Sequence, residues 1–343
     1  MKIDEIKTIT LPKKRDEEFL KINFEALFSY DFKNVKNFEF DKNLKTIKDE
    51  NSYESILFSI VKNFDENQKI LVIDKDINEP IILIHNMKED ETFFTNSLRI
   101  EVKENIKASI IELFVNSSNN SCFAVNRNIV LEKNASLEYV KIQDIDLSNS
   151  MIFATSCEQN ENSNLEISNF EFGEGFIVNS FENIINKEFI NYELNGLTKL
   201  KDSSNTSTLV KTIHNEKNST SFVNYKNSLK DKSRAVIKIK SIVNQNAQFT
   251  KAFQNCNTIL LSDDATIFAQ PHLEIYIDEL EASHGTTTGT LNEEQLLYLQ
   301  SRGIRKEKAY DMLLNAFESS IKDNIKDEKI KEFIENYKKE KYV

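Results

Sequence analysis

Glycine, proline and tryptophan are scarce in this chain of 343 residues, which has six glycines, three prolines and no tryptophan. Glycine averages about 7% and proline about 5% in proteins, so the usual residues of tight turns are largely missing here. Asparagine also tolerates left-handed backbone and caps turns with its own side chain. Because asparagine is frequent throughout the middle of the chain, we expect it to form the turns there.

Cysteine is rare as well. Cys122, Cys157 and Cys256 lie far apart, and the sequence has no C-x-x-C pair and no cysteine–histidine spacing suited to zinc. We therefore predict three reduced thiols, buried as small apolar residues, in a cytoplasmic protein.

Long apolar runs and an excess of positive charge are also missing. The apolar runs are short, such as IILI at 81–84, and residues 1–19 contain no apolar stretch. These features predict neither a membrane span nor a secretory signal. The net charge of −11 argues against non-specific binding to nucleic acid or to an anionic membrane.

The patterns that are present divide the chain into three regions. Residues 1–67 form a mixed and partly helical region, in which Ile56, Leu57, Ile60 and Phe64 have helical spacing. Residues 68–290 consist of short alternating segments with asparagine-rich turns, and residues 291–343 are helical. The fold class we predict is mainly β, with helical regions on both sides of a β core.

A loose repeat within residues 68–290 favours a β-helix, or solenoid, for this core. Polar runs are followed by an apolar residue that begins an alternating segment at Leu137, Leu165, Phe189 and Phe222. Repeats of about 20–50 residues are typical of solenoids, whose units bury their apolar face only by stacking. The spacing is irregular, and an antiparallel sandwich would also give short strands with polar turns.

The last region reads as three helices. Asn292 is a good N-cap with Gln295 three residues later, and Gly303 lies where a helix often ends. Apolar residues recur at helical spacing through 309–321 and again through 330–337. Periodicity does not decide whether these apolar faces pack on the β core or meet another protein.

No catalytic motif is recognisable. The segment GTTTGT has no lysine of a phosphate-binding loop, and Asp263 and Asp264 would point to opposite faces of a strand. His214 fits a turn or a partly buried position, and His272 shares one strand face with Glu274. His284 stands in ELEASHGTTTG, between the last alternating segment and the helices.

Residues 214–317 resemble the SufB/SufD family of iron–sulfur cluster assembly scaffolds. The resemblance rests on ILLSDDATIFAQPHLEIYIDELEASHGTTTGTLNEEQLLYLQSRGI followed by AYDMLLNAF, and LPKKRDEEFLKINFEAL near the start is a partial match. The SHG motif resembles the SufD branch. Ala265 stands where the SufB branch has a cysteine, so the chain cannot supply that thiolate.

The resemblance implies a right-handed parallel β-helix and a non-catalytic scaffold. It implies pairing with SufB through the β-helix and binding of the ATPase SufC through the C-terminal helices. His284 would then contribute to a nascent iron–sulfur cluster at the SufB interface, with no cofactor held stably by the isolated chain. The residues expected to meet SufC are Leu297, Leu299, Arg302, Gly303, Ile304, Leu313 and Phe317.

Two alternatives remain open at this point. A β-helix enzyme acting on polysaccharides would need several acidic and basic residues on one sheet face, and no such cluster is evident. A stand-alone homodimer would instead place two His284 side chains opposite each other across a two-fold axis, because an uncovered sheet edge invites strand pairing.

Overall fold

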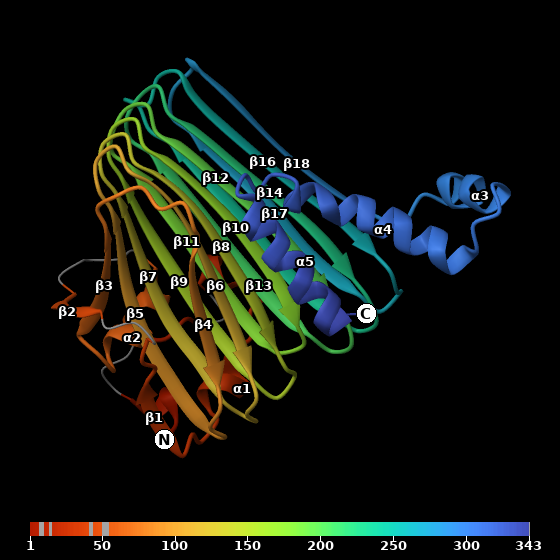
Figure 1. Ribbon diagram of the computed structural model, residues 1–343, viewed down its shortest axis with the longest axis horizontal. Coiled ribbons are helices and arrows are strands. Elements are labelled where there is room, and N and C mark those ends of the chain that lie inside the picture. Colours follow the sequence, from red (N-terminus) through yellow and green to blue (C-terminus); the bar gives the residue numbers. More distant parts are fainter. Residues whose placement is uncertain (7–9, 14–15, 41–43, 50–54, 343) are drawn as a thin grey trace.

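The computed structural model describes residues 1–6, 10–13, 16–40, 44–49 and 55–342. Its core is a solenoid of two long sheets, between which successive strands alternate (Figure 1). This confirms the predicted mainly β class with a parallel β-helix core and helices near both ends of the chain. The partly matching segment LPKKRDEEFLKINFEAL includes residues 14–15, which lie outside the described residues.

One sheet has ten strands, here called sheet A. It contains β1 (Asn34–Asn37), β2 (Lys45–Lys48), β3 (Asn67–Ile73), β5 (Thr92–Val102), β7 (Cys122–Leu131), β9 (Ser150–Gln159), β11 (Phe176–Ile185), β13 (Asn205–His214), β15 (Arg234–Val243) and β17 (Thr266–Ile275).

The other sheet has eight strands, here called sheet B. It contains β4 (Ile81–Met87), β6 (Lys107–Asn116), β8 (Ser136–Ile145), β10 (Asn164–Gly173), β12 (Asn191–Leu200), β14 (Thr220–Leu229), β16 (Thr250–Leu260) and β18 (Leu280–Gly289). The strands pair in parallel, apart from the antiparallel pair β2–β3. Strand alternation directs every second side chain into the space between the sheets.

The repeat predicted from the sequence is half right. Leu137 and Leu165 are register partners in neighbouring turns. Phe189 was wrongly placed on a strand, because the next partner in that row is Tyr192 and Phe189 is an exposed corner residue with φ of 60°. Phe222 lies one position beyond that row, opposite Glu193. An apolar residue at a corner therefore resembled the start of a strand.

Asparagine does form many of the corners, as the scarcity of glycine predicted. Asn105, Asn134 and Asn162 all have left-handed backbone, with φ between 58° and 63°. Their side chains form a ladder from turn to turn, in which Asn162 donates to Asn134 and Asn134 donates to Asn105, each at 2.8 Å. The short amide stabilises the strained corner by local hydrogen bonding.

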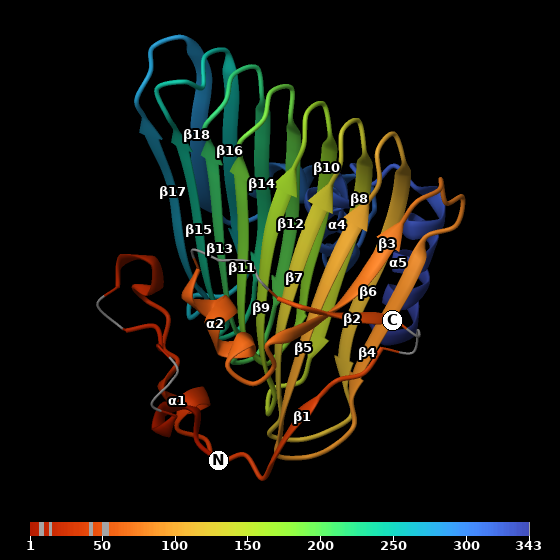
Figure 2. The same ribbon diagram turned by 90° about the vertical axis from the view of Figure 1, so that its left-hand side faces the viewer.

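Helices and the first segment of the chain cover the outer faces of both sheets. On sheet A, the first segment together with α1 (Glu25–Phe28) and α2 (Ile56–Lys62) buries a cluster that includes Phe58 and Ala124 (Figure 2). On sheet B, α5 (Glu328–Tyr342) and the end of α4 (Lys306–Lys322) bury Ile330 and Ile321 against Phe170.

The remaining helix, α3 (Glu293–Ser301), has no buried residue and stands away from the solenoid with the adjoining part of α4 (Figure 1). Its predicted N-cap is confirmed, since Asn292 Oδ1 accepts the backbone N–H of Gln295 at 3.0 Å. Gly303 ends it with φ of 85°. Of the two alternatives for the helical region, packing on the β core holds for α5. The helix α3 instead leaves Leu297 and Tyr298 exposed.

The two ends of the solenoid differ. At the first turn, the interior is covered by a group that we call the plug, made of Phe38, Phe40 and Leu44, which pack against the interior core. At the last turn, β17 and β18 are the terminal strands of their sheets, and no further described strand pairs with them. We call this open end, formed by β17 and β18, the mouth.

Candidate functional site at the mouth of the solenoid

His284 lies in the middle of β18, the last strand of sheet B. Its register partner on β16 is Gln254, which is buried, and the next partner in the row is Val223, a member of the interior core. Ala282, two residues earlier on β18, packs against the interior beside Ala252. By strand alternation, His284 therefore faces inward at the mouth, where it is exposed because no further turn covers it.

Gly285 follows His284, and the packing around it would leave room for a side chain. A Cβ atom at this position would meet only Asn255 Oδ1, at an ordinary 3.5 Å. The glycine therefore leaves the backbone beside His284 uncovered without being required by packing.

The strand β17 forms the opposite lip of the mouth and carries His272. There Glu274 accepts from Lys240 at 2.6 Å, and His272 Nε2 lies 3.3 Å from the same carboxylate oxygen. The hydrogen bond from Lys240 is the main reason that the pKa of Glu274 is lowered. The sequence placed His272 and Glu274 on one face, and the structure brings them together there.

A groove of about 690 Å³ separates the end of β18 from α3 and α4. Three of the residues predicted to meet a partner, Leu299, Leu313 and Phe317, line this groove together. Lys226 of β14 fixes one wall, since its ammonium lies 4.6 Å from the Phe317 ring centroid and donates to the Phe317 carbonyl at 2.9 Å.

The other predicted partner-binding residues lie around the α3–α4 junction. Leu297 is 64% exposed on α3, and the Arg302 guanidinium lies 5.2 Å from the centroid of the Tyr298 ring. Gly303 forms the junction, and the Ile304 N–H donates to the Leu299 carbonyl at 3.2 Å. The structure thus divides the predicted set between the groove and the exposed side of α3.

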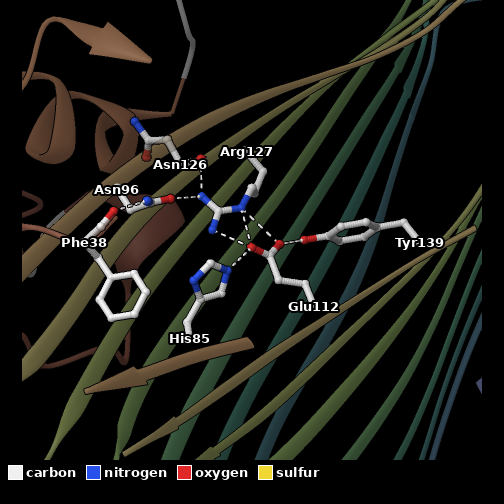
Figure 3. A network of polar contacts seen from close by, with 7 residues as sticks. All are labelled: Phe38, His85, Asn96, Glu112, Asn126, Arg127 and Tyr139. Carbon is white, nitrogen blue, oxygen red and sulfur yellow. Dashed lines mark hydrogen bonds and ion pairs between the residues drawn. The ribbon is translucent and has the colours of Figure 1, made fainter. Parts of the chain in front are cut away.

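Sequence reasoning missed a buried polar cluster in the first turns of the solenoid. The side chains of His85, Arg127 and Tyr139 converge on the Glu112 carboxylate (Figure 3). Burial would raise the pKa of Glu112, but the charge of Arg127 and the hydrogen bond from His85 outweigh it and hold that pKa well below its usual range. Arg127 also donates to Asn96 at 2.9 Å.

A second buried cluster surrounds Lys141. Its ammonium donates to Gln143, to Asn169 Oδ1 at 3.1 Å and to Asn179 Oδ1 at 3.0 Å. Burial lowers the pKa of Lys141 to about 7, although Glu171 nearby opposes this shift. Both clusters are enclosed, so they organise the interior and are not open to a large substrate.

One inward-facing row of sheet B links these clusters to the mouth. We call it the central row; from the first turns to the mouth it consists of Glu112, Lys141, Asn169, Gly196, Tyr225, Cys256 and Thr286. Charged residues alternating with apolar ones usually indicate a solvated strand face, so this row was hard to recognise from the sequence. The closest signal was Arg127 within AVNRNIV, between apolar neighbours.

The cysteines are all buried and unbridged, as predicted. Within the described ranges, no group of three or more His, Cys, Asp or Glu side chains could hold a metal ion. None of the helices in the described part of the chain is long and apolar enough to cross a membrane.

Residues 84–317 match the family model described as SUF system FeS cluster assembly, SufBD core domain, which is more than half of the chain. The chain belongs to the SufBD family. This match includes the solenoid from β4 onward, the mouth and the groove-lining part of α4.

Relatives named SufD place the chain on the SufD side of that family. It is 28% identical over 240 residues to the iron–sulfur cluster assembly protein SufD of Escherichia coli, covering 68% of this chain and 55% of that protein. It is 26% identical over 288 residues to SufD of Plasmodium berghei, covering 78% of this chain and 21% of that protein. A SufBD family protein of Synechocystis is 38% identical over 93 residues, covering 27% of this chain and 20% of that protein.

Proposed function

We propose that this chain is a SufD-like, non-catalytic scaffold of iron–sulfur cluster assembly in the cytoplasm. In this proposal, the mouth pairs with SufB and places His284 beside a nascent cluster, which is cargo and is not held stably by the isolated chain. The observation that carries the proposal is the mouth itself, because β18 offers an unpaired edge with an exposed, inward-facing histidine. Solenoids need a polar cap or a partner at each end; among the described residues the plug covers the first turn, and no further strand pairs with the last.

The same proposal assigns α3 and the groove to SufC. Three of the predicted contact residues line one groove together with Tyr298, and Leu297 is exposed on the neighbouring surface of α3. Exposed apolar side chains on a projecting helix are typical of a docking site for another protein. ATP hydrolysis would belong to SufC and not to this chain.

Co-purification with SufB and SufC tests both assignments. In Thr286→Lys, an inward-pointing charge at the mouth should abolish capture of SufB and leave capture of SufC intact. In Leu297→Asp, the expected result is the reverse, and Leu147→Asp, at a turn residue that is 55% exposed, is the matched control. Failure of the unaltered chain to capture either protein would refute the proposal.

A substitution of His284 tests the cluster assignment. Because His284 is exposed, His284→Ala should leave the fold and the pairing intact and lower the iron and sulfide content of the assembled complex. Unchanged iron and sulfide would remove the ligand role.

A stand-alone homodimer through the mouth is the second candidate, favoured by the same unpaired edge. The native mass of the purified chain, with and without SufB, separates it from the heterodimer. The polysaccharide-active alternative has no supporting observation once the family is known.

A further inference from the structure

Cys256 lies one strand inside the mouth, next to His284 on the inner face of sheet B. The register pairs Gln254 with His284 and Cys256 with Thr286, so these four side chains form a block two residues wide on adjacent parallel strands. Adjacent strands lie about 4.8 Å apart and rise about 3.3 Å per residue, so diagonal neighbours are about 8 Å apart at the backbone, within reach of a histidine side chain. The thiol of Cys256 and the imidazole of His284 are such a diagonal pair.

The surroundings of Cys256 hold polar atoms that the fold does not satisfy. Asn227 Nδ2 donates to Cys256 Sγ at 3.4 Å and to Thr258 Oγ1 at 3.1 Å, yet Asn227 Oδ1 is buried without a partner. Gln254 is similar, since its amide N–H groups donate to Ser241 Oγ and to the His272 carbonyl while its Oε1 is buried and unpartnered. Two buried carbonyl oxygens therefore lie beside the thiol without a hydrogen-bond donor among the described residues.

Unpartnered buried oxygens of this kind cost free energy unless a donor or a cation is supplied. Cys157 on β9 is a useful contrast, because it is equally buried inside the solenoid but lies several turns from the mouth and from any exposed histidine. Unpartnered oxygens of Thr155 and Asn183 also lie beside Cys157, so among the described residues it is the exposed imidazole that distinguishes the block around Cys256.

We propose that Cys256 and His284 are the two ligands that this chain contributes to a thiophilic transition-metal site at the mouth. Thiolate and imidazole together are suitable ligands for iron, cobalt and zinc, whereas amide oxygens bind these metals only weakly. The proposal deepens the proposed function, on which it rests for the biological metal. It also agrees with the finding that the described residues contain no three-ligand group, since solvent or a partner must supply the other ligands.

Binding would exchange a proton for the metal. Burial raises the pKa of the Cys256 thiol to about 11, although the hydrogen bond from Asn227 opposes this shift. The divalent metal takes the thiolate sulfur as a ligand, the thiol proton passes to water, and no oxidation is involved.

Titration of the isolated chain with Co²⁺ alone tests the site. Thiolate ligation gives a sulfur-to-cobalt charge-transfer absorption in the near ultraviolet, which histidine alone does not give. Cys256→Ser should abolish this absorption, and Cys157→Ser, the matched control, should keep it. His284→Ala should weaken Co²⁺ binding at least about tenfold, since even groups that only support metal ligands contribute that much.

The proposal is overturned if the unaltered chain shows no such absorption, or if Cys157→Ser rather than Cys256→Ser removes it. Circular dichroism checks that each variant folds. If Cys256→Ser does not fold, His284→Ala decides, because an exposed side chain can be removed without disturbing the core. Since this titration needs neither SufB nor SufC, its failure is distinguishable from a failure of the co-purification test.

Discussion

At the scale of single residues, the ionisable groups of the two interior clusters are surrounded by hydrogen-bond partners. The Glu112 carboxylate accepts from His85, Arg127 and Tyr139, and the Lys141 ammonium donates to three side-chain carbonyls. A buried charge that loses its partner costs several kcal/mol, so the partners of each group must be retained together.

Replacing Glu112 by Gln should be strongly destabilising, because the fully buried Arg127 guanidinium would lose its counter-charge. We expect the free energy of unfolding, measured by urea denaturation, to fall by about 3–5 kcal/mol. The control is Glu132→Gln, which breaks a surface pair with Lys103 and should cost less than about 1 kcal/mol. Similar losses in the two variants would contradict this account of the cluster.

Lys141 should make stability depend on pH above neutrality. Its pKa is about 7 in the folded chain and 10.5 ordinarily, so between these values the unfolded chain binds a proton that the folded chain does not. The free energy of unfolding should therefore rise with pH in this window, by up to about 1.4 kcal/mol per pH unit from this group.

Denaturation series from pH 7 to 10 measure this slope. Lys141→Met should flatten the slope, even if the unpaired carbonyls lower stability overall, whereas Lys230→Met, at an exposed position, should not. A slope that is the same in Lys141→Met as in the unaltered chain would show that Lys141 remains charged.

At the scale of elements, the sheets depend on an exact match between neighbouring strands. Gly196 on β12 faces Tyr225 on β14, and a Cβ at Gly196 would come within 2.0 Å of the tyrosine ring. The ring lies over the glycine and its hydroxyl accepts from Asn169 Nδ2 at 3.1 Å, one strand further on. The missing side chain thus makes room for a contact that spans two strand spacings.

Gly196→Ala should lower the free energy of unfolding by about 1–3 kcal/mol through overpacking. Gly289→Ala is the matched control, because a Cβ there meets nothing within 4 Å, and it should be neutral. Adding Tyr225→Leu to Gly196→Ala should recover part of the loss, and a double-mutant cycle measures this coupling. Purely additive losses would mean that the ring does not occupy the glycine's space.

Much of the elements' arrangement could be predicted from the sequence, but the interior and one part of the repeat could not. Asn292 and Gly303 carry their capping signals locally, so the ends of α3 were predictable. Phe189 was wrongly predicted to begin a strand, because the neighbouring sequence does not distinguish a phenylalanine at a corner from one in a strand. His284 stood out by its place between the alternating segments and the helices, and the resemblance supplied its expected role. Its inward direction and its closeness to Cys256 follow from the register, which local patterns do not specify.

At the scale of the whole molecule, the solenoid is closed at one end and open at the other. Among the described strands, those in the middle pair on both sides, whereas β17 and β18 at the mouth and β4 at the first turn each pair on one side. The backbone amides of both sheets are therefore less protected from hydrogen exchange near the mouth. Binding of a partner there would complete the last turn and stabilise it.

Hydrogen exchange should report this gradient directly. We expect the backbone amides of β18 to exchange faster than those of β8 and β10, because local opening needs the loss of one neighbour only. Addition of SufB should slow exchange in β18 and leave α2, on the outer face of sheet A, unchanged. Uniform protection of β8, β10 and β18 in the isolated chain would contradict an open mouth.

The plug has a consequence for the order in which the molecule is made. Its residues, Phe38, Phe40 and Leu44, precede the turns that they cover, so a ribosome releases the closed end first. Each later turn then packs on the turn that has already folded, and the most recently synthesised turn is the one that is not yet covered. If the mouth binds a partner as proposed, we therefore expect the nascent chain to recruit it only after β18 has left the ribosome.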